Sequence, residues 1–219
     1  IKLSKTAYTY NGKVQKPSVT VKDSTGKPLK AGADYTVNYP KGRKAVGRYG
    51  VQVKLKGKYK GSRTVYFTVK PKGTSISKVT GGKKKLTVTW KKQTTQTTGY
   101  QIQYSTSSNF KNAKTVTVSK NSTTKKTITG LKNGKKYYVR VCTYKTVKTG
   151  HKSTKYYSNW SKSKNTASAK KSAPKGNTVY VSPTGKKYHY IKSCAGKHPI
   201  KTTLKEAKKN HTPCKKCAM

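Results

Sequence analysis

Short runs in which apolar and polar residues alternate constrain the fold of this 219-residue chain more than any other feature. Successive side chains of a β-strand point to opposite faces of a sheet, so this alternation gives each run one buried face. Turn residues such as Asn-Gly and Lys-Gly separate the runs, which lie at residues 19–21, 35–39, 49–55, 64–69, 86–90, 100–104 and 137–141. The pattern predicts a mostly β protein, with helix only after about residue 200.

Residues 1–71 form the first expected β module. The run GADYTVNY, followed by VGRYGVQVKLKGKYKG, resembles an Ig-like repeat in surface proteins of Gram-positive anaerobes. The resemblance covers nearly the whole module. It implies a β-sandwich that acts as a stalk or spacer rather than as a catalyst.

Residues 74–168 form the second expected module, after a short Pro-Lys-Gly linker. Apolar residues alternate along each of its runs, which predicts the inner faces of two packed sheets. Trp90, the run GYQIQYS, and Leu131 followed six residues later by Tyr137 resemble a fibronectin type III domain. The chain is therefore expected to hold two Ig-like/fibronectin type III β-sandwiches in series.

The second module carries one expected side-chain stack. Tyr138, Arg140 and Cys142 have the opposite parity to the buried run and are expected to face outward. The segment Ser-Asn-Trp-Ser at 158–161, expected on the last strand, resembles half of a WSxWS-type box. That resemblance implies a cation–π contact between Trp160 and Arg140, with a structural role. The alternative is that Trp160 covers a sandwich edge without Arg140.

Residues 178–219 form a small α+β module, here called the zinc knuckle, after an expected flexible linker at 169–177. His189, Cys194, Cys214 and Cys217 follow the spacing H-x4-C-x19-C-x2-C. Thiolate and imidazole groups in a set of four are the ligands that Zn²⁺ prefers, and a 42-residue module has too small a core to fold unaided. We therefore expect a structural Zn²⁺ held by these four side chains.

Local features of the knuckle predict two strands at 179–181 and 187–189, and a helix that begins at Thr203 and ends near Asn210. Thr203 and Glu206 have the spacing of a capping box. The pattern YHxxxC…PCxxC resembles a small Ada-like metal-binding module of bacterial secreted and surface proteins. His198 and His211 are rival ligands, and a disulfide from Cys194 to Cys214 or Cys217 is the competing interpretation.

Charge limits the classes of partner and of reaction. The chain has 52 Lys and Arg residues against three acids, Asp23, Asp34 and Glu206, for a net charge of +49. Such a surface attracts anionic polymers such as teichoic acid, extracellular DNA and acidic glycans; lysines that only solvate the outer strand faces are the alternative. Three carboxylates leave almost nothing for acid–base catalysis, so we expect no enzyme and no catalytic residue.

The expected function is a non-catalytic scaffold, secreted or at the cell surface, that holds anionic polymers and also binds other surface proteins. No apolar stretch reaches the roughly 18–20 residues of a membrane span. The first residue is Ile1 rather than Met, and we expect further residues upstream of it. Two alternatives are a nucleic-acid-binding protein that reads through its zinc knuckle and the C-terminal targeting region of a secreted enzyme.

Overall fold

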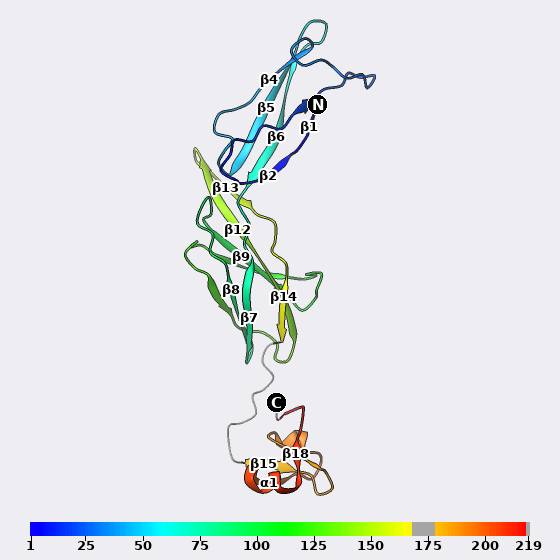
Figure 1. The fold of residues 1–219 in the computed structure, drawn as a ribbon, viewed down its shortest axis with the longest axis vertical. Helices are drawn as coiled ribbons and strands as arrows, with labels where there is room; N and C mark the ends of the chain where they lie inside the picture. Colours follow the sequence, from blue (N-terminus) through cyan, green and yellow to red (C-terminus); the bar gives the residue numbers. More distant parts are fainter. Residues whose placement is uncertain (168–177, 218–219) are drawn as a thin grey trace. The chain divides into compact units, whose positions relative to one another are not determined.

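The computed structural model describes residues 1–167 and 178–217 (Figure 1). The expected linker at 169–177 lies outside the described residues. The fold is mostly β, as predicted. The chain divides into two compact units. The first contains Ile1–Val79, Thr87–Thr127 and Tyr137–Asn165. The second contains Thr80–Leu86, Ile128–Lys136 and Thr166–Met219.

A four-stranded sheet forms the first part of the first unit. Its order is β2-β6-β5-β4, with β2 parallel to β6 and the other pairs antiparallel. The bounds are β2 Ala7–Thr9, β4 Tyr35–Asn38, β5 Gly47–Leu55 and β6 Ser62–Lys70. A small second sheet pairs β1 (Lys2–Leu3) with β3 (Val19–Thr20). The alternating residues of both sheets meet in a core that contains Leu3, Val51, Phe67 and Val69.

Residues 76–167 contain a five-stranded and a three-stranded sheet. In the first, β10 (Lys114–Val118), β9 (Gly99–Ser105), β12 (Lys136–Thr149) and β13 (Lys152–Tyr157) follow one another, and β14 (Lys164–Ala167) pairs with β12. In the second the order is β11 (Lys125–Ile128), β8 (Lys85–Trp90) and β7 (Ile76–Gly82). Most of the alternating residues predicted to face inward are buried, among them Leu86, Val88, Tyr100, Ile102, Val139 and Val141, whereas Tyr104 is half-buried.

The Arg140–Trp160 contact is confirmed, and it has a second member. The guanidinium carbon of Arg140 lies 4.9 Å from the centre of the Trp160 ring and 4.1 Å from that of Phe110. Arg140 Nε also donates to Gln103 Oε1 at 2.7 Å. Phe110 lies in the loop between β9 and β10 with a positive φ of 62°, outside the alternating runs, so the sequence pattern gave no indication of it.

Residues 158–161 are not a strand, although they run beside β12. The hydroxyl of Ser161 accepts the N–H of Val141, and the hydroxyl of Ser158 accepts that of Thr143, each at 3.1 Å. Side-chain oxygens therefore take the place that carbonyl oxygens hold in a regular ladder. This pairing keeps Trp160 over the outer face of β12.

The prediction that Cys142 faces solvent is wrong, because only 1% of its surface is exposed. The position of Cys142 in the alternation places its side chain on the outer face of β12. On that face the residues two positions before and after it are packed against other side chains. Arg140 lies against aromatic rings, and Tyr144 packs on Tyr157 with ring centres 5.9 Å apart. Strand parity thus gives the direction of a side chain and not its exposure.

The C-terminal residues form a four-stranded sheet of order β17-β15-β16-β18, with one helix. The bounds are β15 Thr178–Val181, β16 Lys187–His189, the short 3-10 helix η1 Lys192–Cys194, β17 Ile200–Thr203, α1 Leu204–Asn210 and β18 Thr212–Pro213. The predicted strands and helix are confirmed. Val179, Val181, Tyr188 and Ala207 form a small core under the helix.

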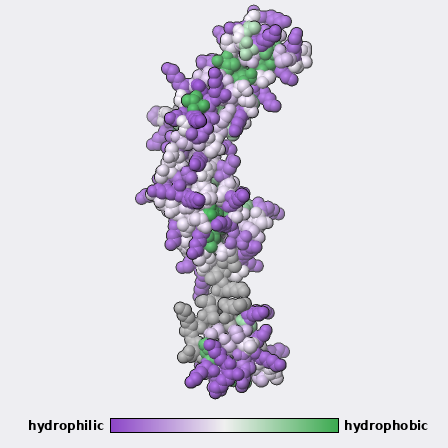
Figure 2. Space-filling model, viewed as in Figure 1, coloured by the Kyte–Doolittle hydropathy of each residue, from purple (hydrophilic) through white to green (hydrophobic). Residues whose placement is uncertain are grey.

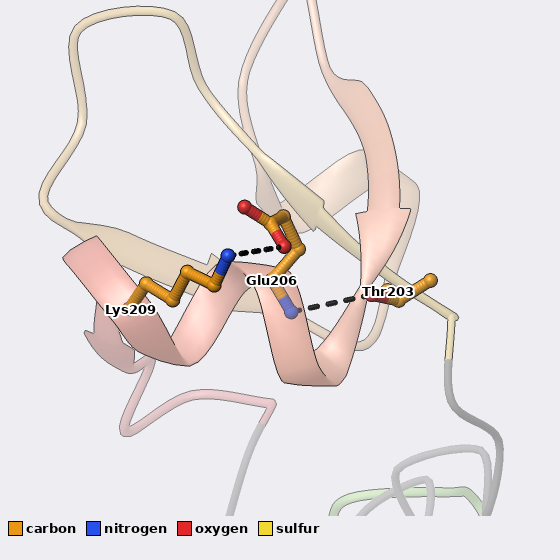
Figure 3. Close-up of polar contacts among 3 residues, drawn as sticks. All are labelled: Thr203, Glu206 and Lys209. Carbon is orange, nitrogen blue, oxygen red and sulfur yellow. Dashed lines mark hydrogen bonds and ion pairs between the residues drawn. The ribbon is translucent and has the colours of Figure 1, made fainter.

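Thr203 caps α1 as predicted, and its hydroxyl accepts the N–H of Glu206 at 3.2 Å (Figure 3). The other half of the predicted capping box is not formed: the Glu206 carboxylate points along the helix to Lys209, with 3.1 Å between Oε2 and Nζ, and not back to the Thr203 N–H. Its charge lies in the first turn, where the helix dipole favours an anion.

Hydrophilic residues cover most of the visible surface of each part of the chain (Figure 2). The basic residues are not confined to one end: residues 1–71 carry 17, residues 72–171 carry 24 and residues 172–219 carry 11. The structure therefore distributes positive charge over every sheet that it describes.

Candidate metal centre

The parallel pairing of β16 with β18 brings the two halves of the cysteine–histidine pattern together. Pro213 pairs with Tyr188, and the N–H of Cys214 donates to the Tyr188 carbonyl at 3.0 Å. Cys214 is thereby held beside His189, which ends β16. A tight turn follows, in which the N–H of Cys217 donates to the carbonyl of Cys214 at 3.2 Å.

The helix η1 positions the fourth side chain. Cys194 ends this single turn, and its N–H donates to the Ile191 carbonyl at 3.0 Å. The N–H of the next residue, Ala195, donates to the Lys192 carbonyl at 3.1 Å, and Ala195 is buried. The turn therefore fixes the backbone on both sides of the Cys194 thiol.

The four ligand atoms of His189, Cys194, Cys214 and Cys217 all lie within 4.8 Å of one another. Cys194 Sγ is 3.9 Å from Cys214 Sγ, and Cys217 Sγ is 3.6 Å from His189 Nδ1. Tetrahedral Zn²⁺ with bonds of about 2.3 Å to sulfur and 2.0 Å to nitrogen separates its ligand atoms by about 3.5–3.8 Å. The spacing of these residues fits such an ion.

The pKa values of Cys194 and Cys214 are shifted in opposite directions. Burial, followed by the nearby thiols of Cys217 and Cys214, raises the pKa of Cys194 to about 11. Burial also acts to raise the pKa of Cys214, but hydrogen bonds, first from the Lys216 backbone N–H, lower it overall. Burial and Lys187 lower the pKa of His189, which favours the neutral imidazole that a metal needs.

Distances and exposure distinguish between the alternatives for these residues. The 3.9 Å between Cys194 and Cys214 is about twice the length of a disulfide bond, and the cysteines are free thiols. His198 is exposed, and His211 follows α1; neither belongs to the cluster found among the described residues. His189 is the histidine that the fold brings to the three thiols.

No carboxylate belongs to the cluster found among the described residues. Asp23 accepts three hydrogen bonds within its own turn, from Thr25 N and Oγ1 and from Lys27 N, and the bond from the Thr25 hydroxyl is the first cause that lowers its pKa. Asp34 accepts the N–H of Lys30 at 2.7 Å. Each acid is used locally, and the cluster consists of thiols and one imidazole.

No helix within residues 1–167 and 178–217 has the length and apolar character of a membrane span.

Comparison with known proteins identifies one of the β modules. Residues 69–159 match the family model of the fibronectin type III domain, and this part of the chain is such a domain. No curated protein sequence matches the chain.

Several solved structures resemble the chain. The chicken CNTN1 FN1-FN3 domains are 21% identical over 57% of this chain and 44% of that chain, with a TM-score of 0.39. A segment of two fibronectin type III domains from chicken tenascin is 23% identical over 57% of this chain and 67% of that chain, with a TM-score of 0.35. A beta-1,2-glucanase from Parabacteroides distasonis is 15% identical over 55% of this chain and 18% of that chain, with a TM-score of 0.34.

Proposed function

We propose that this chain is a non-catalytic scaffold of the bacterial surface or of the secreted fraction, which attaches to anionic polymers through its basic surface. Its modules are an Ig-like repeat of a Gram-positive surface protein at 1–71, the fibronectin type III domain at 74–168 and a zinc knuckle at 178–219. Teichoic acid, extracellular DNA and acidic glycans are the partner polymers. Other surface proteins are further partners.

The observation that carries the proposal is the spread of 52 basic residues over all parts of the chain, against three acids. A protein that reads nucleic acid through one element concentrates its charge along that element. Charge distributed over every module instead supports contacts along the length of a flexible polymer. The fibronectin type III domain supports a scaffold, since domains of this kind commonly serve as extracellular binding modules.

A structural Zn²⁺ completes the proposal. His189, Cys194, Cys214 and Cys217 are its four ligands, and a set of four protein ligands leaves no open position for water or substrate. The ion supplies stability to a sheet whose core contains only a few apolar side chains.

Binding of the full chain to heparin, duplex DNA and teichoic acid tests the proposal. We expect similar affinities for the three polymers. Each affinity should fall about 100-fold or more between roughly 50 and 200 mM salt, because the release of counterions drives the binding. Neutral dextran is the control and should not bind. Failure of all three polymers to bind at 50 mM salt would refute the proposed function. A preference for DNA that survives 200 mM salt and disappears with a zinc chelator would identify a nucleic-acid-binding protein instead.

A further inference from the structure

A pocket with a volume of about 580 Å³ lies beside the metal cluster. The residues that line it come from β15 and from the segment that follows β16 and contains η1. Its lining includes Tyr180, Tyr190, Ile191, Lys192, Ser193 and Lys197. The volume is within the range of pockets that hold one small ligand or one unit of a polymer.

Two tyrosines give the pocket its apolar wall. Tyr190 is held in place from behind, because its ring packs edge-on against Tyr188 at 5.9 Å and 78°, and Tyr188 belongs to the core. Tyr180 lies on the opposite face of β15 from the buried Val179 and Val181. Both tyrosines are half-buried, so each leaves part of a ring and a hydroxyl available to a ligand.

The polar groups of the pocket are donors of hydrogen bonds and positive charges. Lys192 and Lys197 are exposed, and Ser193 adds a hydroxyl to the lining. Across the described part of the second unit Glu206 is the one acidic residue, and its carboxylate is bound to Lys209 on the helix (Figure 3). No carboxylate lines the pocket. Its ligand must therefore bring the negative charge.

The arrangement favours a sugar unit over a nucleic-acid base. Proteins that bind single strands place aromatic rings one after another along a groove, so that successive bases stack. Here the two tyrosines share one pocket, with two ammonium groups and a hydroxyl at the same place. A pyranose ring presents an apolar face to an aromatic ring, while its acidic substituent and hydroxyls accept hydrogen bonds.

We propose that this pocket is the site at which the chain binds one acidic sugar unit of a glycan, with the ring on Tyr180 and Tyr190 and the acidic group between Lys192 and Lys197. This inference rests on the proposed function and gives it a defined contact site. The metal cluster supports the pocket, because Lys192 and Ser193 directly precede the ligand Cys194 on η1. Metal binding and sugar binding thus share one backbone turn.

The test uses the full chain and a heparin hexasaccharide at about 150 mM salt. The double variant Lys192→Gln/Lys197→Gln removes the two charges of the pocket. The double variant Lys205→Gln/Lys208→Gln removes two exposed charges of α1 and is the matched control for net charge. We expect the pocket variant to weaken binding about tenfold, since two charge-assisted contacts are lost, and the control to change it by less than about threefold.

Further measurements distinguish the contribution of the sugar ring to binding from that of its charge. We expect Tyr190→Leu to weaken hexasaccharide binding and Tyr190→Phe to retain most of it, with zinc content showing that both variants fold. Binding of inorganic polyphosphate, which has no ring, should be equal in Tyr190→Leu and the unchanged chain. Equal losses of hexasaccharide affinity in the two lysine double variants would overturn the proposed sugar site. So would a pocket double variant that loses more affinity for oligo-dT than for the hexasaccharide. An unchanged chain that binds no polymer even at 50 mM salt would instead refute the proposed function.

Discussion

Cysteine occurs in two chemical settings in this chain. Cys142 is buried on β12, and burial raises its pKa to about 12 despite a hydrogen bond from the backbone of Gln101 and the charge of Arg140. Cys194, Cys214 and Cys217 lie together with His189 at the candidate metal centre. A thiol reacts as its thiolate, so these two settings differ in reactivity as well as in position.

We expect Cys142 to resist iodoacetamide at pH 8 in the folded chain. A rise in pKa from 9.0 to about 12 lowers the thiolate fraction about a thousandfold, and burial further restricts access. Cys214, whose pKa lies below its ordinary value, should become reactive when a chelator removes zinc, while Cys142 should react only after denaturation. Peptide mass spectrometry measures labelling at each site. Labelling of Cys142 at the same rate in folded and denatured chain would contradict its burial.

The four residues of the candidate metal centre lead to a second prediction at the same scale. Elemental analysis of the unchanged chain should give about one zinc per chain, because four ligands of one site bind one ion. His189→Ala should lower that content severalfold and speed hydrogen exchange in residues 178–217 while residues 1–167 keep their exchange rates. His198→Ala, at an exposed histidine outside the cluster, is the control and should keep its zinc. Full zinc content in His189→Ala would remove His189 from the ligand set.

Among the elements, α1 is held mainly at its first turn. It has seven residues, which is too short for a helix that is stable by itself in water. The Thr203 cap, the packing of Ala207 and the neighbouring strands hold it in place. The exposed pair between Glu206 and Lys209 adds little, because each side chain is more than half exposed.

Thr203→Ala should therefore destabilise the C-terminal sheet and helix by about 1 kcal/mol, the usual effect of losing a cap. Thr203→Ser keeps the oxygen that accepts the Glu206 N–H and should stay within about 0.5 kcal/mol of the unchanged chain. Hydrogen exchange of the α1 amides at fixed zinc concentration measures the difference. Equal protection in both variants would mean that the hydroxyl does not contribute to helix stability.

On β12, the stacked Arg140 allows a test of geometry at constant charge. Arg140→Lys keeps the positive charge but loses the planar group that lies between Phe110 and Trp160, and we expect a loss of about 1 kcal/mol. Arg48→Lys is the control: Arg48 stacks at 3.6 Å on Tyr66, whose side chain is 46% exposed, so a smaller loss is expected. Urea unfolding gives both values. A larger loss in the control would show that the double stack is not the stronger contact.

For the whole molecule, the net charge of +49 opposes compactness through repulsion between like charges. Added salt screens this repulsion, with a screening length that falls from roughly 30 Å at 0.01 M to 10 Å at 0.1 M. The Tm of the chain at pH 7 should therefore rise between 10 and 150 mM NaCl in calorimetry. Acetylating the lysines is the control and should reduce the rise. A Tm that falls with salt would mean that specific ion pairs outweigh the repulsion.

Much of this molecule could be predicted from its sequence because the informative patterns are local. Alternation predicted β5, β6, β8, β9 and β12. The Thr203–Glu206 spacing predicted α1, and the cysteine spacing predicted which thiols the fold brings to His189. In each case neighbouring residues carry the physical cause, either the two-residue period of a strand or the first turn of a helix.

Features that depend on distant segments were not predicted. The parallel bridge between Tyr188 and Pro213 joins two segments with no pattern in common. Phe110 reaches Arg140 from a loop, and the burial of Cys142 depends on side chains that cover an outer face. Such contacts result from the assembled sheets, and a window of sequence does not contain them.

The abundance of lysine also has a consequence for proteolysis. With 52 Lys and Arg residues among 219, the chain offers a trypsin-like protease a cleavable bond about every four residues. A protease needs an extended, unpaired stretch of backbone, so bonds inside β5, β6 and β12 are accessible only when those strands open. The hairpin turn between β5 and β6, with Lys56, Lys58 and Lys60, is exposed without such opening. Resistance of the chain to such a protease thus depends on how rarely these small sheets come apart.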